Sequence, residues 1–485
     1  MTLQESQIAA NTTYYTLGLI GQKIISFFYF ILIARFLGAE DIGRYILALS
    51  VTAMLFIFLD SGITTLITRE TAQDQGALKK YFASIIRFKI SASIVVFIAA
   101  AVFVNFLGYS EVIRNLIYLA SIVMIFDTFS LTFYGILRGV HLLIYESLAT
   151  FIYQVIVFTI GVLGLYIYGS VYALMIALIF ASAFNVLFSY HFLKKHLHFS
   201  LFEKGESFGV RRLISLSLPF AIAAIFTKII FTSDTILLSL FRSGEELGWY
   251  GVAHKFLFAL EFVPLAFSAS LFPAMSSYYI NDKNSLFSSL EKSSFYLMLI
   301  AFPISLGGFL LTSPIIEALY GNEFAGSAAS LRFLLLGLPF LFLNYPLISF
   351  FAAIKRQNLN IYFLGAALMV NLAFNFILIP RIGGAGAAIA FVSAMAVLFI
   401  INIIAAKIVS QFSFRGYFMN AFSIFLSAGA MAFVIWLIRF YIPWWAGIIC
   451  GAIIYAVILI TGRLISMDDF KKFALQIIRK TSNEI

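Results

Sequence analysis

The sequence contains little charge and almost no cysteine. Of its 485 residues, 11% are charged, and there is a single cysteine, Cys450. Soluble domains carry about 25% charged residues, so water cannot be the solvent for most of this chain. One cysteine excludes an internal disulfide, a cysteine metal cluster and a thiol redox motif. Cys450 is therefore expected to pack within the apolar run GIICGAII.

The motifs of several function classes are also missing. The chain has no glycine-rich phosphate-binding loop and no histidine, cysteine and aspartate set with metal-ligand spacing. The longest connection between apolar segments, Lys194–Leu213, has about twenty residues. That is too short for a nucleotide-hydrolysing domain or for the large catalytic loop of a membrane glycan ligase or polymerase. The sequence therefore predicts a protein that is not an enzyme and that binds no cofactor or metal.

Long apolar segments dominate what is present. Apolar residues make up 62% of the chain, and its mean hydropathy is +1.01. A membrane-spanning helix needs roughly 20 apolar residues at a rise of about 1.5 Å each, and about fourteen segments of the chain meet this requirement. The predicted fold class is all-α: a polytopic membrane protein of about 14 transmembrane helices.

The distribution of positive charge predicts the orientation. If the N-terminus is cytoplasmic, about two thirds of the 32 lysines and arginines fall in loops or tails on the cytoplasmic side. We therefore expect a multi-pass protein of the cell inner (plasma) membrane with both termini cytoplasmic. This asymmetry and the attraction of cations to anionic lipid account for the net charge of +10, so no nucleic-acid partner is expected.

A polar phrase occurs twice. Ala39–Tyr45 reads AEDIGRY, and Gly244–Tyr250, 205 positions later, reads GEELGWY. A shift near 217 further on pairs Arg138 with Lys355 and Gly169 with Gly386. We interpret the phrase as the corner of a helical hairpin, in which acidic residues favour the helix start and Gly43 permits a tight turn.

These repeats predict two pseudo-symmetric six-helix lobes around a central cavity. Because six spans is an even number, both lobes insert the same way up, and transporters with such parallel repeats bind substrate between them. The predicted divisions are an N-lobe (1–193), a cytoplasmic linker (194–213), a C-lobe (214–406), two further spans (407–463) and a cytoplasmic amphipathic tail (464–485).

Ionisable groups inside spans indicate function, because each costs about 2.5–3.5 kcal/mol to insert. Such groups lie mainly in the first, second, seventh and eighth spans. Three lysines are candidates for binding a diphosphate in the cavity: Lys23, Lys228 and Lys255. Four more residues are candidates for coupling to an ion: Asp60, Asp234, His254 and Glu261.

Structural roles remain open for these acidic and polar groups. Asp60 could neutralise Lys23, and Asp234 could accept a hydrogen bond from Thr232 or Thr235. His254 could simply pack, and the Glu261 carboxylate could satisfy backbone freed by Pro264. A structural role is also expected for Asp127, and Asn371 and Asn375 are expected to hydrogen-bond between helices.

Three stretches resemble a known family. FLGAEDIGRYILALSVTAMLFIFLDSGITTLITRETA and SLPFAIAAIFTKIIFTSDTILLSLFRSGEELGWYGVAHKF are similar to polysaccharide transport proteins, the Wzx-type O-antigen or lipid-linked oligosaccharide flippases. These belong to the multidrug/oligosaccharidyl-lipid/polysaccharide exporter superfamily. ILIPRIGGAGAAIA resembles a small-residue motif found there. The resemblance implies a cavity between the lobes, lined by spans one, two, seven and eight. By the same resemblance, Asp234 matches an acidic position, and Asp60 to Arg69 match the end of span two.

The expected function is therefore transport. A flippase would move a polyprenyl-diphosphate-linked oligosaccharide, a precursor of surface polysaccharide or lipopolysaccharide, outward by alternating access, with Na⁺ or H⁺ coupling. Its partners would be that lipid-linked oligosaccharide, membrane lipid, and polysaccharide polymerase or assembly proteins. Two alternatives remain: an ion-coupled multidrug or cation exporter of the same superfamily, and a non-transporting envelope-assembly protein. Three lysines favour an anionic substrate, whereas Asp60, Asp234 and Glu261 leave the sign of the cavity undecided.

Overall fold

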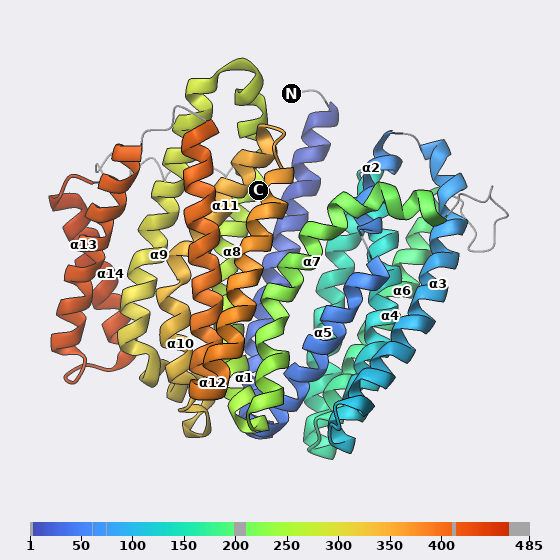
Figure 1. Ribbon diagram of the computed structural model, residues 1–485, viewed down its shortest axis with the longest axis horizontal. Helices are drawn as coiled ribbons and strands as arrows, with labels where there is room; N and C mark the ends of the chain where they lie inside the picture. Colours follow the sequence, from blue (N-terminus) through green and yellow to red (C-terminus); the bar gives the residue numbers. More distant parts are fainter. Residues whose placement is uncertain (1–2, 61, 74, 198–209, 410–413, 465–485) are drawn as a thin grey trace. The chain divides into compact units, whose positions relative to one another are not determined.

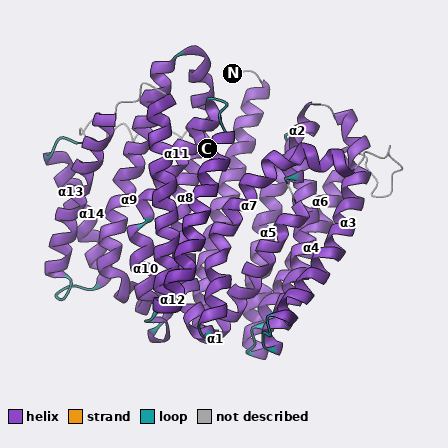
Figure 2. Cartoon of the chain, viewed as in Figure 1, coloured by secondary structure: helices purple, strands orange, loops and turns teal. Residues whose placement is uncertain are grey.

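The computed structural model describes residues 3–60, 62–73, 75–197, 210–409 and 414–464. Most of the predicted linker (194–213) and all but the first residue of the predicted tail (464–485) lie outside these ranges. Within them every regular element is a helix, as Figure 2 shows, so the all-α prediction is confirmed.

The helices follow one another with short connections (Figure 1). They are α1 (Leu3–Asp60), α2 (Ile63–Gln73), α3 (Gln75–Phe106), α4 (Glu111–Gly139), α5 (Leu143–Tyr168), α6 (Tyr172–Leu197), α7 (Val210–Phe241), α8 (Gly244–Asn281), α9 (Lys283–Tyr320), the 3-10 helix η1 (Asn322–Phe324), α10 (Ser327–Leu336), α11 (Leu338–Ala353), α12 (Asn358–Val409), α13 (Phe414–Ile438) and α14 (Trp444–Thr461).

The number of spans agrees with the prediction. Eleven of the described helices are long and apolar enough to cross a membrane, or twelve if α10 and α11 form one span bent by 42°. Two of these helices are hairpins that each hold two membrane-length halves. α1 turns at Gly38 (φ 77°) and runs back in Figure 1, and α12 is interrupted at Ile382 and Gly383. Counting each hairpin twice gives the fourteen predicted spans of a multi-pass membrane protein.

The chain forms two compact units. One comprises Met1–Lys255, Leu319–Ser327 and Asn360–Phe391, and the other comprises Phe256–Ala318, Ala328–Leu359 and Val392–Ile485. This division follows contacts rather than repeats, and it crosses α8, α9 and α12. The lobe limits inferred from the repeats therefore stay a prediction.

Within the first unit, small residues let α2 and α4 approach closely. A Cβ atom on Gly139 would lie 2.6 Å from the Thr71 side chain and 2.9 Å from the Thr68 carbonyl oxygen. One turn earlier, Gly135 faces Thr64 in the same way. Small residues at such spacing are typical of helix contacts in membranes, where close backbone approach replaces the hydrophobic effect.

The repeat is visible in local geometry, with one correction to its alignment. Gly169 (φ 58°) and Gly383 (φ 56°) both adopt the left-handed conformation, whereas Gly386 is helical. The pairing of Gly169 with Gly386 was therefore wrong by three positions. The corrected shift, 214 positions from Gly169 to Gly383, also pairs His141 (φ 63°) with Lys355 (φ 59°). These two residues follow the ends of α4 and α11. A single alignment thus relates the two helix ends and the two glycine turns.

Candidate functional site

The two copies of the polar phrase lie against each other in the first unit. A Cβ atom on Gly43 would overlap the carbonyl oxygen of Gly244, and one on Gly248 would overlap that of Ala39. The 205-residue repeat relates Gly43 to Gly248 and Ala39 to Gly244. It therefore converts one contact into the other, and the contact has an internal two-fold symmetry. The role predicted for Gly43 was wrong: Gly38 makes the turn, and Gly43 permits a helix-to-helix contact.

Carboxylates brace the corners next to this contact. Glu323 accepts a hydrogen bond from the backbone N–H of Ala39 at 2.7 Å, and Glu246 accepts one from Gly384 at 2.9 Å. Each N–H opens a helix after a left-handed glycine, where unpaired donors and the helix dipole favour an acid. The Trp249 indole also donates to the carbonyl of Glu323 at 2.8 Å. The corners are therefore held by contacts from segments that are distant in sequence.

Asp234, on α7, is 1% exposed and surrounded by neutral donors. Its carboxylate accepts hydrogen bonds from the Tyr250 hydroxyl (2.9 Å), the Asn371 amide (3.0 Å) and the Asn375 amide. The expected bonding of both asparagines between helices is confirmed. Thr232 is not a partner, since its hydroxyl donates to the Lys228 carbonyl at 2.8 Å. Within the described ranges no lysine or arginine forms an ion pair with this aspartate.

Asp60 has a different environment. The Lys89 ammonium donates to Asp60 at 3.2 Å, to the Thr128 hydroxyl at 2.7 Å and to the Thr128 carbonyl at 3.1 Å. The partner of Asp60 is thus Lys89 rather than Lys23. Sequence reasoning had counted Lys89 as a cytoplasmic loop residue, but it lies within α3 and is fully buried.

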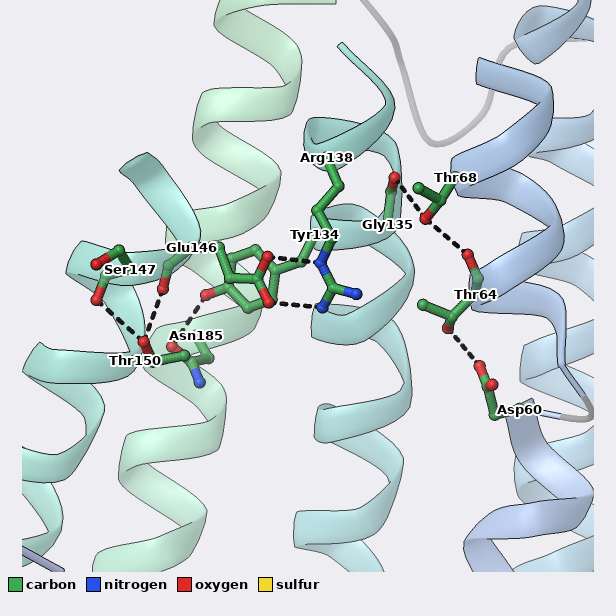
Figure 3. Close-up of polar contacts among 10 residues, drawn as sticks. All are labelled: Asp60, Thr64, Thr68, Tyr134, Gly135, Arg138, Glu146, Ser147, Thr150 and Asn185. Atoms are coloured by element: carbon green, nitrogen blue, oxygen red, sulfur yellow. Dashed lines mark hydrogen bonds and ion pairs between the residues drawn. The ribbon is translucent and has the colours of Figure 1, made fainter. Parts of the chain in front are cut away.

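A polar ladder continues from Asp60 along α2 to α4 (Figure 3). The Thr64 hydroxyl donates to Asp60, and the Thr68 hydroxyl contacts both the Thr64 and Gly135 carbonyls at 2.9 Å. Nearby, two parallel hydrogen bonds of 2.6 Å join the Arg138 guanidinium to the Glu146 carboxylate. These bonds tie the end of the second span to the interior of the α4–α6 bundle.

The remaining acidic and histidine candidates have structural contacts. Asp127 accepts a hydrogen bond from Ser182 at 2.7 Å. His254 stacks on Tyr250 at 5.5 Å between ring centroids and meets the Phe391 ring edge-on at 5.8 Å. In the second unit, Glu261 accepts a hydrogen bond from the Tyr345 hydroxyl.

The structure brings two of the three candidate lysines together. Lys23 is exposed, and Lys255 is half-buried with its ammonium 5.5 Å from the centroid of the Phe30 ring. Lys255 therefore lies against α1, the helix that also carries Lys23. Lys228 is also half-buried, on α7.

Comparison with known sequences places the chain in a family. The profile of the polysaccharide biosynthesis protein family matches residues 8–279, more than half of the chain, and a MatE profile matches residues 219–377. The chain belongs to the polysaccharide biosynthesis protein family. This membership confirms the resemblance noted in the sequence.

Individual relatives have low sequence identity to this family member, but the alignments cover most of both proteins. The capsular polysaccharide biosynthesis protein CapF of Staphylococcus aureus is 23% identical over 393 residues, which cover 78% of this chain and 94% of that protein. A Shigella flexneri protein described as "Putative O-antigen transporter" is 22% identical over 374 residues, covering 74% and 88%.

Solved structures show the same fold. The lipid II flippase MurJ in an inward closed conformation superimposes with a TM-score of 0.78 at 18% identity, covering 93% of this chain and 98% of MurJ. An inward-facing multidrug resistance MATE family transporter gives 0.63 at 16% identity, covering 80% and 94%. At these identities the likeness concerns the fold alone.

The second unit of this polysaccharide biosynthesis family member contains an apolar cavity of about 430 Å³. Its walls come from α8, α9, α10, α13 and α14, and Tyr455 supplies one of its few polar groups. Gly307, Gly308 and Gly451 contribute to the lining and keep it wide. Its volume lies within the range of about 300–1,000 Å³ that is usual for small-molecule sites.

Sequence reasoning missed Lys89, Tyr250 and Tyr345. Lys89 directly precedes the apolar run that begins at Ile90, so hydropathy placed it outside the membrane. Tyr250 belongs to the repeated phrase, but nothing in the phrase indicates that it is fully buried against Asp234. No sequence signal connects Tyr345 to Glu261, 84 positions away.

Proposed function

We propose that the protein is a flippase, which moves a polyprenyl-diphosphate-linked oligosaccharide from the inner to the outer leaflet of the cell inner membrane by alternating access. The observation that carries this proposal is the pair of neighbouring lysines, Lys23 and Lys255, within the spans of a polysaccharide biosynthesis family member. Relatives and neighbours whose names state an activity are transporters or flippases rather than enzymes.

The charge of the pair favours an anion. Two ammonium groups that repel each other in apolar surroundings are stabilised when a diphosphate binds between them, because low dielectric strengthens both interactions. A cationic drug would add to the repulsion. With a negative cell interior, outward movement of about two negative charges gains ~4.6 kcal/mol at ~100 mV. The protein therefore needs mainly to lower the barrier for a hydrated headgroup.

The contact between the repeated phrases supports alternating access. The predicted orientation puts the corners at Gly38 and Gly244 on the outer side, where Gly43 and Gly248 join the two repeats. In our proposal this contact closes the outer side and separates when the glycan leaves. Because backbone meets backbone through glycines, the contact can re-form without rearranging side chains.

The apolar cavity fits the lipid part of the substrate. A polyprenyl chain is a linear run of apolar, methyl-branched isoprene units, and the cavity is lined almost entirely by apolar side chains. We propose that it holds a stretch of this chain. The predicted cytoplasmic termini and contacts with a polysaccharide polymerase or other assembly proteins complete the proposal.

Replacing Lys23, Lys228 or Lys255 with alanine should impair transport. Loss of one charge-assisted hydrogen bond to phosphate costs about 1.5–3 kcal/mol, so the rate at low substrate should fall by about tenfold to a hundredfold. Arginine should be partly tolerated because it keeps the charge but changes the donor geometry. The measurement is translocation of a fluorescent polyprenyl-diphosphate oligosaccharide in proteoliposomes at fixed potential.

The assay also separates the alternatives. A cationic dye, measured in parallel, should not be exported. If all three alanine variants transport glycan normally, the lysine site is wrong. Export of the dye in place of the glycan would favour the cation exporter. A wild-type protein that moves neither substrate would favour an assembly role.

Filling the apolar cavity should also slow transport. Gly307→Leu places a larger apolar side chain in the cavity, where the nearest non-local atom to a Cβ is Met431 Cε at 3.3 Å. We expect about a tenfold lower rate at low substrate, equivalent to about 1.4 kcal/mol. Gly429→Leu is the matched control, since a Cβ there meets nothing within 4 Å. Equal transport by both variants would mean that the cavity does not hold the lipid.

A further inference from the structure

Lys89 is an unusual residue for a membrane-spanning helix. Its side chain is 0% exposed, although a buried ammonium is costly unless it is paired and its protons are satisfied. It donates three hydrogen bonds, all to oxygen: to the Asp60 carboxylate, the Thr128 carbonyl and the Thr128 hydroxyl. An ammonium group has three N–H donors, so these bonds saturate it.

The oxygens around Lys89 resemble a ligand set for a small cation. A carboxylate, a backbone carbonyl and a hydroxyl surround one positive centre, and the Thr64 hydroxyl also bonds to the same carboxylate. Asp60 ends α1 immediately before the break at Gly62 (φ 74°). In transporters, cation sites are typically built where a spanning helix is interrupted. The ammonium stands where a free cation would otherwise bind.

Asp234 provides the contrast. Asp234 is 1% exposed, whereas the Asp60 side chain is 20% exposed. The hydrogen-bond partners of the Asp234 carboxylate are two amides and a phenol, all neutral. Of these two aspartates, one has a permanent counter-charge on the same chain, and the other has neutral partners only.

We propose that the Lys89 ammonium is a tethered cation, which permanently fills a cation site formed by Asp60 and the two Thr128 oxygens. The site holds the end of α1 to α3 and α4 whatever ions are present. Removing the lysine side chain converts it into a site for a dissolved monovalent cation. This inference does not depend on the transported substrate.

The test uses the full-length protein in detergent, with the Asp234→Asn substitution in every sample so that Asp234 cannot contribute. Thermal unfolding is followed in sodium chloride and in choline chloride of equal ionic strength. In Lys89→Ala, the unfolding temperature should rise by several degrees in sodium relative to choline, because a ligand that binds only the folded state stabilises it. The parent with Lys89 intact should show no such difference.

Two comparison variants identify the site. In Asp60→Asn/Lys89→Ala the carboxylate is gone, so the sodium effect should disappear. Lys228→Ala removes a half-buried lysine for which the described structure contains no ion pair, and it should gain no sodium effect. A sodium effect that persists in the double variant, or that appears equally in Lys228→Ala, would overturn the proposal.

Failure to fold is also informative. If Lys89→Ala can be purified in sodium but not in choline, the dissolved ion has replaced the ammonium, as proposed. If it cannot be purified in either salt, or unfolds at the same temperature in both, a free cation does not occupy the site and the proposal is wrong.

Discussion

Gly248→Ala is expected to reduce transport severely. The new Cβ would overlap the carbonyl oxygen of Ala39, a backbone atom that cannot move aside without displacing its helix. Overpacking costs about 1–3 kcal/mol where the neighbouring side chains can shift. The cost should be higher here, because the neighbouring atom belongs to the backbone. The two repeats could then no longer close on each other, and we expect at least about a hundredfold slower glycan translocation, equivalent to about 2.7 kcal/mol.

Gly251→Ala is the matched control for this prediction. It lies one turn further along α8, and its Cβ would meet mainly the end of the flexible Ile46 side chain. It should therefore transport nearly normally. The symmetric change Gly43→Ala, which meets the Gly244 carbonyl, should match Gly248→Ala. The double variant should be little worse than either single one, because both open the same contact and their effects are not additive.

A labelling measurement shows where the defect arises. Cys450 is the only native cysteine, so Cys450→Ser allows a single reporter at Ala39, which is fully buried. A membrane-impermeant maleimide added outside should label Ala39→Cys slowly in the parent and rapidly with Gly248→Ala. Slow labelling in both, together with normal transport, would show that the contact does not gate the outer side.

Hydropathy was sufficient to predict the membrane spans because lipid imposes an apolar composition on each segment separately. The fourteen spans required no knowledge of neighbours, and the hairpins at Gly38 and Gly383 lie at breakers visible in the sequence. The repeat was also found from identities at fixed spacing. The role of Gly43 could not be found in this way. A glycine that allows a turn and a glycine that allows close approach of a second helix look the same in a sequence.

Partnerships among buried polar groups could not be predicted. Lys23 was considered as a possible partner of Asp60, but the bundle places α3 beside the end of α1 and brings Lys89 to the carboxylate. The prediction that Asp234, Asn371 and Asn375 lie within spans was sound. Their convergence depends on how α7 packs against α12, which local periodicity does not determine.

Asp234→Asn is expected to abolish the response of transport to an ion gradient. A buried carboxylate with three neutral donors can exist as the acid or can bind Na⁺, whereas a permanent ion pair would resist both. We propose that the cation occupies Asp234 in one state and leaves in the other. That differential binding links the ion to the glycan.

The measurement holds proteoliposomes at fixed potential and imposes only a sodium or a pH gradient. Wild-type translocation should change by a factor within the usual range for coupled sites, about 5–150-fold, while Asp234→Asn should keep only the potential-driven rate. Asp127→Asn is the control, since it removes a carboxylate that accepts a hydrogen bond from Ser182. If Glu261→Gln abolishes the response and Asp234→Asn does not, coupling lies with the Tyr345 pair instead. If neither gradient alters the wild-type rate, the glycan moves by potential alone, and Asp234 serves to hold α7 against α12.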